Sequence, residues 1–239
     1  MASGWTKRIL DAPRVAPGED ALKPALDALG GEVVKLRSRD GLRLGGRWLP
    51  ADPGPLPSGA VEEPGAPTPW GDEWRPDPYE AILLLHGWTG SSVPDLVEQG
   101  PTLRRTAGVL GLDFRGHGAS DDAPTTFGLH EAEDVAGALE WLGERGIRRV
   151  ALIGSSMGGT VAIASVVVLG DGSLTQADLD PAAPAAVTTA PRPRIVGIVA
   201  EAVAPDLRIP IANRMRLPLG GVVRRAVAGR LFSAASASV

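Results

Sequence analysis

The sequence of 239 residues contains no cysteine. A chain without thiols forms no disulfide bond and offers neither a thiolate nucleophile nor a thiolate metal ligand. Aromatic residues are scarce, at 4% of the chain, so a core must be built mainly from Val, Leu, Ile and Ala. The length still suffices for one domain with a sizeable core.

Histidine is nearly absent as well. The chain has only His86, His117 and His130, and their spacing matches no metal-binding motif. Nor is there a dinucleotide or phosphate-binding fingerprint, so we expect neither a metal nor another cofactor. The formal net charge of −4 gives no reason to expect a nucleic acid partner.

Long apolar runs are also missing. None is long enough to span a bilayer, and no apolar segment follows Lys7 and Arg8 near the N-terminus. The sequence therefore predicts a cytoplasmic protein without an integral membrane segment.

The first part of the chain predicts a helix and a hairpin. Residues 18–29 have a helical pattern that stops at two glycines. Residues 32–39 and 42–49 have strand patterns, and Asp40-Gly41 between them is typical of a tight turn.

After the predicted hairpin, the spacing of the apolar residues changes. Residues 51–79 are rich in Pro and Gly, which predicts a long surface loop. Apolar side chains at helical spacing predict a helix from Leu129 to Leu142, ending near Arg145-Gly146. The remaining signals are four continuous apolar runs, Ala81–Leu85, Val109–Asp113, Val150–Ile153 and Ile195–Ala200. Such runs, separated by helical stretches, indicate an α/β fold with a parallel sheet buried on both faces.

The third run leads into a G-x-S-x-G pentapeptide from Gly154 to Gly158, followed by an apolar helix-like run. In a strand–turn–helix setting this motif presents a nucleophilic serine, here Ser156. Gly154 and Gly158 would allow the close packing of that turn. The alternative is a glycine-rich turn without chemistry.

The first run ends in His86-Gly87-Trp88. The loop after this strand supplies one oxyanion-hole N–H in such an architecture, and the residue after the nucleophile supplies the other. These would be the backbone N–H groups of Trp88 and Met157. His86 is expected to hold the loop in shape, with proton transfer as the alternative.

Together with Asp113–Ser120, these motifs resemble the α/β-hydrolase superfamily, in particular bacterial esterases, lipases and prolyl-oligopeptidase-like serine hydrolases. The resemblance covers about residues 32–207. It implies an α/β-hydrolase fold, a mostly parallel sheet flanked by helices, with Ser156 as nucleophile and Trp88 and Met157 as the oxyanion hole. It also implies that His117 is structural.

One departure from the family matters. The triad partners follow in the order serine, acid, histidine, yet all three histidines precede Ser156. We therefore expect a C-terminally truncated hydrolase without its last strands, acid and base. Asp206 could serve as an acid on an earlier strand, or simply cap a helix. The domains expected are 1–31 as an extension with a short helix, 32–207 as the core including an insertion at 170–194, and 208–239 as a partial cap.

The expected function is hydrolysis of a small-molecule carboxylic ester, or alternatively an amide or peptide, through an acyl-Ser156 intermediate. It would be impaired here, because serine without a base is a weak nucleophile. One alternative is an inactive pseudoenzyme or binding module of the same fold, and another is a second polypeptide that supplies acid and base. The run 194–200 would leave an open apolar edge that favours self-association unless the Arg-bearing segment 208–230 covers it. That segment could instead be a membrane-surface helix.

Overall fold

The computed structural model describes residues 14–15, 18–52, 79–169 and 192–203. Most of the predicted loop 51–79 and of the insertion 170–194, and all of the segment 208–239 with Asp206, lie outside the described residues. The described elements, in chain order, are η1 (Glu19–Leu22), α2 (Lys23–Leu29), β1 (Glu32–Arg37), β2 (Arg43–Leu49), β3 (Ala81–Leu85), α3 (Val93–Leu103), β4 (Gly108–Leu112), α4 (Glu131–Glu144), β5 (Arg149–Ser155), α5 (Met157–Leu169) and β6 (Arg194–Glu201).

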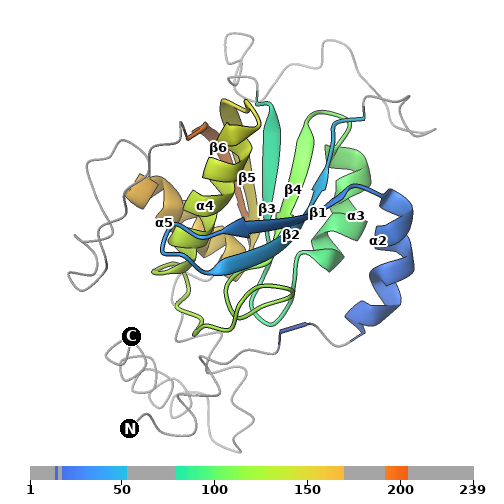
Figure 1. Ribbon diagram of the computed structural model, residues 1–239, viewed down its shortest axis with the longest axis horizontal. Coiled ribbons are helices and arrows are strands. Elements are labelled where there is room, and N and C mark those ends of the chain that lie inside the picture. Colours follow the sequence, from blue (N-terminus) through green and yellow to red (C-terminus); the bar gives the residue numbers. More distant parts are fainter. Residues whose placement is uncertain (1–13, 16–17, 53–78, 170–191, 204–239) are drawn as a thin grey trace, which may run out of the picture.

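The strands form one six-stranded sheet in the order β1-β2-β4-β3-β5-β6 (Figure 1). β4, β3, β5 and β6 are mutually parallel, as the four apolar runs predict. β1 and β2 form the expected antiparallel hairpin, which joins the sheet through an antiparallel pairing of β2 with β4. The predicted fold class and hairpin are thereby confirmed.

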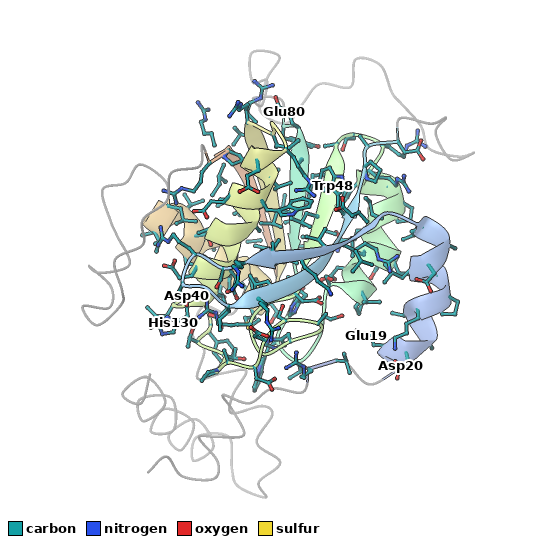
Figure 2. The ribbon with its side chains drawn as sticks, viewed as in Figure 1. Glu19, Asp20, Asp40, Trp48, Glu80 and His130 are labelled. Atoms are coloured by element: carbon teal, nitrogen blue, oxygen red, sulfur yellow. The ribbon has the colours of Figure 1, made fainter. Side chains whose placement is uncertain are left out.

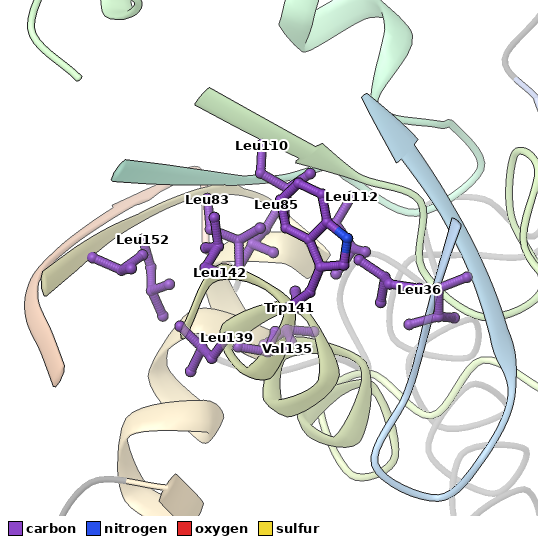
Figure 3. Close-up of a cluster of buried hydrophobic side chains, with 14 of the residues drawn as sticks. Leu36, Leu83, Leu85, Leu110, Leu112, Val135, Leu139, Trp141, Leu142 and Leu152 are labelled. Atoms are coloured by element: carbon purple, nitrogen blue, oxygen red, sulfur yellow. The ribbon is translucent and has the colours of Figure 1, made fainter. Parts of the chain in front are cut away.

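Helices cover both faces of the sheet, and alternate strand residues pack against each layer. On one face, Leu83 and Leu85 of β3 belong to the large core cluster that includes Leu139 and Trp141 of α4 (Figure 3). On the other face, Ile82 and Leu84 pack in a second cluster with Leu26 of α2 and Leu96 of α3. Because both faces of β3 are covered, its sequence must be continuously apolar.

The sequence pattern gives no expectation for α3. This helix carries Pro94 in its first turn and both Gly100 and Pro101 near its end, which weakens a helical pattern. Gly100 is small because β2 lies against it: a Cβ atom added there would lie 2.9 Å from Leu49 Cδ1. Packing against the sheet, rather than the local sequence, therefore makes this segment helical.

The fourth apolar run forms β6 at the end of the described sheet order. Its neighbour on one side is β5, and most of its residues are exposed, with Val199 50% accessible. Among the described residues the expected open apolar edge is therefore present. None of the described helices combines the length and apolar character needed to cross a membrane.

Candidate active site

The predicted site residues gather where the parallel strands end. Glu80, just before β3, marks the end of the molecule where the parallel strand β3 begins. His130 and Glu19 lie at the opposite end, where β3 finishes (Figure 2). At this carboxyl end the chain leaves β3, β4, β5 and β6 in loops that contain all the predicted motifs. Ligands of open α/β sheets bind at this edge.

Ser156 lies between β5 and α5, in the strand–turn–helix setting that the sequence predicts. Its backbone has φ 53°, a left-handed conformation that is unfavourable for residues other than glycine. Its N–H donates a 2.8 Å hydrogen bond to the carbonyl oxygen of Glu201 at the end of β6. Unlike its neighbours, Ser156 is exposed, so the turn presents its hydroxyl to solvent.

The glycines beside Ser156 are required by close backbone packing. A Cβ atom added at Gly158 would overlap the Leu85 carbonyl oxygen and lie 2.8 Å from the His86 carbonyl oxygen. One added at Gly154 would overlap the carbonyl oxygen of Gly158. Both glycines therefore lie where the backbone is closely packed, and their role in supporting the site remains a prediction.

The loop after β3 lies against this turn. A Cβ atom added at Gly87 would lie 3.6 Å from the Ser156 Cβ, so the two backbones are close neighbours. The next residue, Trp88, packs edge-to-face on Phe127, with ring centroids 5.3 Å apart. Ser156, Trp88 and Met157 are therefore brought together as predicted, and their catalytic roles remain predictions.

His86 holds the start of this loop. Its side chain is 1% exposed, and its Nε2 accepts a 3.1 Å hydrogen bond from the N–H of Phe114. Its Nδ1 lies 2.7 Å from the carbonyl oxygen of Gly87, so Nδ1 carries the proton. Burial, reinforced by neighbouring His117, lowers the pKa of His86 to about 4. A neutral ring with both nitrogens engaged fits the expected shaping role.

His117 is fully buried in the turn after β4. Its Nδ1 lies 2.9 Å from the Arg115 carbonyl oxygen, and burial lowers the pKa of its imidazole. Its Nε2 has no hydrogen-bond partner among the described atoms. Its ring centroid lies 5.1 Å from that of His86 in an edge-to-face arrangement, so the two buried histidines pack the β3 and β4 loops against each other.

Asp113, at the end of β4, ties these loops together. Its Oδ1 accepts hydrogen bonds from the Ser92 N–H at 2.8 Å and the Ser92 hydroxyl at 2.7 Å. Its Oδ2 accepts one from the Ala119 N–H at 2.9 Å. One buried carboxylate therefore fixes the end of the β3 loop against the β4 turn.

Arg115 anchors the β4 turn to the rest of the molecule. Its guanidinium donates to Asp134 on α4 at 2.7 Å and to Asp40 in the β1–β2 turn at 2.9 Å. Burial disfavours the charged form, but these two carboxylates more than offset it, so the pKa of Arg115 is raised. The network rigidifies the carboxyl end of the sheet.

Backbone strain is concentrated at the same edge. Among the described residues, four other than glycine have a left-handed φ: Thr89, Phe127, Ser156 and Ala202. They occupy the loops after β3, β4, β5 and β6 respectively, one in each. Conformations of this kind cost about 1–3 kcal/mol each and cluster at functional sites. The strain therefore marks this edge as the candidate site independently of the sequence motifs.

Asp95 on α3 lies within electrostatic reach of Glu201, the residue whose carbonyl oxygen accepts the Ser156 N–H. Burial, together with the charges of Glu98 and Glu201, raises the pKa of the Asp95 carboxyl on α3 to about 6. Within the described parts of the chain, no cluster of three or more His, Asp or Glu side chains has an arrangement suited to a metal ion.

A model of the alpha/beta hydrolase family matches residues 82–238, which is well over half of the chain. The chain belongs to the alpha/beta hydrolase family. The match begins in β3 and includes the β3 loop, the β4 turn and the pentapeptide around Ser156. The resemblance inferred from the motifs is thereby confirmed.

Three individual proteins are similar to parts of this chain. A serine hydrolase-like protein of Danio rerio is 34% identical over 115 residues, covering 43% of this chain and 32% of that protein. An alpha-beta hydrolase structure from Vibrio vulnificus is 16% identical with a TM-score of 0.59, covering 95% of this chain and 66% of that one. A Pyrococcus furiosus esterase structure is 24% identical with a TM-score of 0.46, covering 69% and 53%. The chain thus spans 32% to 66% of the lengths of these three proteins.

Sequence reasoning missed several residues that shape the site. Glu131 accepts hydrogen bonds from the Thr126 N–H at 2.7 Å and the Gly128 N–H at 2.8 Å, and so fixes Phe127 between them. Glu19 bonds to the β3 loop from the N-terminal segment. The only sequence signal for Glu131 is its place as an acidic residue in the first turn of the predicted helix, and that signal does not reveal its contacts with the preceding loop.

Proposed function

We propose that this chain is a serine hydrolase that acts on carboxylic esters through an acyl-Ser156 intermediate. The observation that carries the proposal is the exposed Ser156 in a left-handed turn between β5 and α5, with the β3 loop packed on its backbone. Membership of the alpha/beta hydrolase family supports it. The proposed substrate is a small ester or acyl compound.

In the proposed reaction Ser156 Oγ forms a bond to the ester carbonyl carbon, and the C–O bond to the alcohol breaks. The hydroxyl proton leaves with the alcohol. Water then attacks the acyl carbon, the bond to Oγ breaks, and the acid is released. The backbone N–H groups of Trp88 and Met157 would stabilise the oxyanion in both steps, and one such donor is typically worth about 3–4 kcal/mol.

We further propose that this chain alone hydrolyses esters poorly. No histidine follows Ser156 in the sequence. His86 is buried with both ring nitrogens engaged, and His117 is buried beside it, so neither can serve as the base. Loss of a triad member leaves roughly 10³–10⁴-fold catalysis over water.

The test compares the purified chain with Ser156→Ala on a short p-nitrophenyl ester, with and without imidazole in the buffer. Imidazole can supply the missing general base in solution. We expect slow Ser156-dependent release of p-nitrophenolate that rises with imidazole concentration. Equal rates for both proteins at every imidazole concentration would refute the proposal.

Equal rates for the original chain and Ser156→Ala would favour an inactive binding module of the same fold. The observations that support this candidate are that no histidine follows Ser156 in the sequence and that His86 and His117 are buried. Such a module should retain ligand-induced thermal stabilisation in Ser156→Ala.

We also propose self-association through the open edge. β6 presents Ile198 at 38% and Val199 at 50% accessibility, and an unpaired edge strand can pair with another chain. Sedimentation velocity over a hundredfold concentration range should show a dimer that Val199→Lys abolishes. A monomer throughout would contradict this.

A further inference from the structure

A segment near the N-terminus reaches the candidate site. We call residues 14–15 and 18–22 the N-terminal strap. Its Arg14 exchanges hydrogen bonds with Gly118 in the β4 turn: the Gly118 N–H donates to the Arg14 carbonyl oxygen at 2.6 Å, and Arg14 Nη2 donates back to the Gly118 carbonyl at 3.1 Å. The guanidinium also reaches the Asp122 carboxylate. The strap is therefore tied to one of the loops at the carboxyl edge.

Glu19 ties the strap to the other loop. Its side chain is buried, with the residue only 7% exposed, and its Oε1 accepts a 2.5 Å hydrogen bond from the Ser91 hydroxyl. The Ser91 Oγ in turn accepts a 3.1 Å bond from the Val93 N–H in the first turn of α3. A carboxylate is favoured near a helix N-terminus, and a buried hydrogen bond to a charged group is among the stronger ones.

This contact fixes the loop that carries Trp88. Ser91 lies three residues after Trp88, and Thr89 between them has a left-handed φ of 67°. His86 holds the start of the loop and Asp113 holds Ser92 at its end. A strained backbone persists only where its surroundings hold it, so removing an anchor allows the loop to relax.

We propose that Glu19 is a positioning residue, which acts through Ser91 to hold the β3 loop so that the Trp88 N–H points at the oxyanion beside Ser156. The proposal rests on the function proposed above. Glu19 contacts neither substrate nor nucleophile. Its loss should therefore lower the reactivity of Ser156 without altering the rest of the fold.

The test compares Glu19→Ala with Glu19→Gln and Asp20→Ala. Glutamine keeps an acceptor for the Ser91 hydroxyl. Asp20 is the matched control, because its side chain is 87% exposed and forms an ion pair with exposed Lys23. The first measurement is hydrogen exchange at the backbone amides of residues 88–92. The second is the rate at which a fluorophosphonate labels Ser156 in imidazole buffer, forming the Oγ–P bond and releasing fluoride.

We expect Glu19→Ala to accelerate exchange at residues 88–92 and to slow labelling about tenfold, the fold-change expected when a hydrogen bond of ordinary strength is lost. Exchange in β3 and β5 should stay unchanged, Glu19→Gln should recover most of the labelling rate, and Asp20→Ala should match the original chain. Glu19→Ala combined with Ser91→Ala should slow labelling little more than Ser91→Ala alone, because removal of the Ser91 hydroxyl already breaks the contact through which Glu19 acts on the loop.

Unchanged exchange at residues 88–92 in Glu19→Ala would overturn the proposal. So would faster exchange with an unchanged labelling rate, or additive losses in the double variant. If the original chain labels no faster than Ser156→Ala, the proposed function fails, and the exchange comparison still decides whether Glu19 holds the loop.

Discussion

Gly158→Ala tests whether the turn of Ser156 is built on backbone contact with β3. An added Cβ would overlap the Leu85 carbonyl oxygen and lie 2.5 Å from its carbonyl carbon and 2.8 Å from the His86 carbonyl oxygen. Non-bonded carbon atoms prefer about 3.5 Å, so α5 and the end of β3 would have to separate by about 1 Å. All the obstructing atoms belong to the backbone, so no side chain can rotate away.

Two effects of opposite sign set the size of the change. Alanine at a helical position is favoured over glycine by about 1 kcal/mol. Overpacking of a rigid site costs typically about 1–3 kcal/mol, and more where the backbone must move. We therefore expect Gly158→Ala to lower the free energy of unfolding by about 2 kcal/mol. A displacement of about 1 Å at the β3 loop should also slow Ser156 labelling by about 10²-fold.

The assay is urea unfolding beside fluorophosphonate labelling. Gly197→Ala on β6 is the matched control, because a Cβ atom added there meets no heavy atom within 4 Å. It should leave both quantities unchanged or raise stability slightly. If Gly158→Ala unfolds within 0.5 kcal/mol of the original chain, a threshold of about the size of ordinary surface effects, the close-packing argument is wrong.

Three further predictions concern the same edge. The pKa of His86 is about 4 in the folded state and about 6.5 in the unfolded state, so the contribution of its neutral ring to stability is full above pH 6.5 and falls by about 3 kcal/mol as the pH drops towards 4. Urea unfolding from pH 7 to 4.5 should therefore show a steeper loss of stability in the original chain than in His86→Gln. Ser156→Gly should unfold at higher urea than Ser156→Ala, by about 1 kcal/mol, because glycine adopts the left-handed φ without cost; equal midpoints would deny the strain. Burial raises the folded-state pKa of Asp95 to about 6, above the unfolded value, so ionisation destabilises the fold as pH rises through 6; Asp95→Asn should then be the more stable at pH 8 and indistinguishable at pH 4.

The parallel strands were predictable because their burial is symmetric. β3 lies between two strands and two helix layers, so every residue from Ala81 to Leu85 must be apolar, and the run is visible in one dimension. The turn at Ser156 was predictable for a related reason. Gly154 and Gly158 are demanded by contacts with backbone that lies nearby in sequence or at the end of a buried strand.

The contacts that hold the loops were not predictable, because they join residues far apart in sequence. Glu19 and Ser91 are 72 residues apart, and neither residue type is unusual where it stands. An acidic residue in a short helical segment ordinarily faces solvent, as Asp20 does. Only the three-dimensional path of the chain, which brings the strap to the N-terminus of α3, turns the neighbouring Glu19 inward.

Four residues with strained backbone lie in the loops at the carboxyl ends of the parallel strands. Glycine at Thr89, Phe127, Ser156 or Ala202 would remove a cost of about 1–2 kcal/mol at each position, against a typical net stability of only 5–15 kcal/mol. Side chains therefore stand where packing alone would place glycine. At Phe127 the ring packs on Trp88, and at Ser156 the hydroxyl is exposed in the turn. At these two positions the strained backbone carries a side chain that packs in the loop region or is exposed in the turn, and the strain at Ser156 supports the proposal that its hydroxyl is functional.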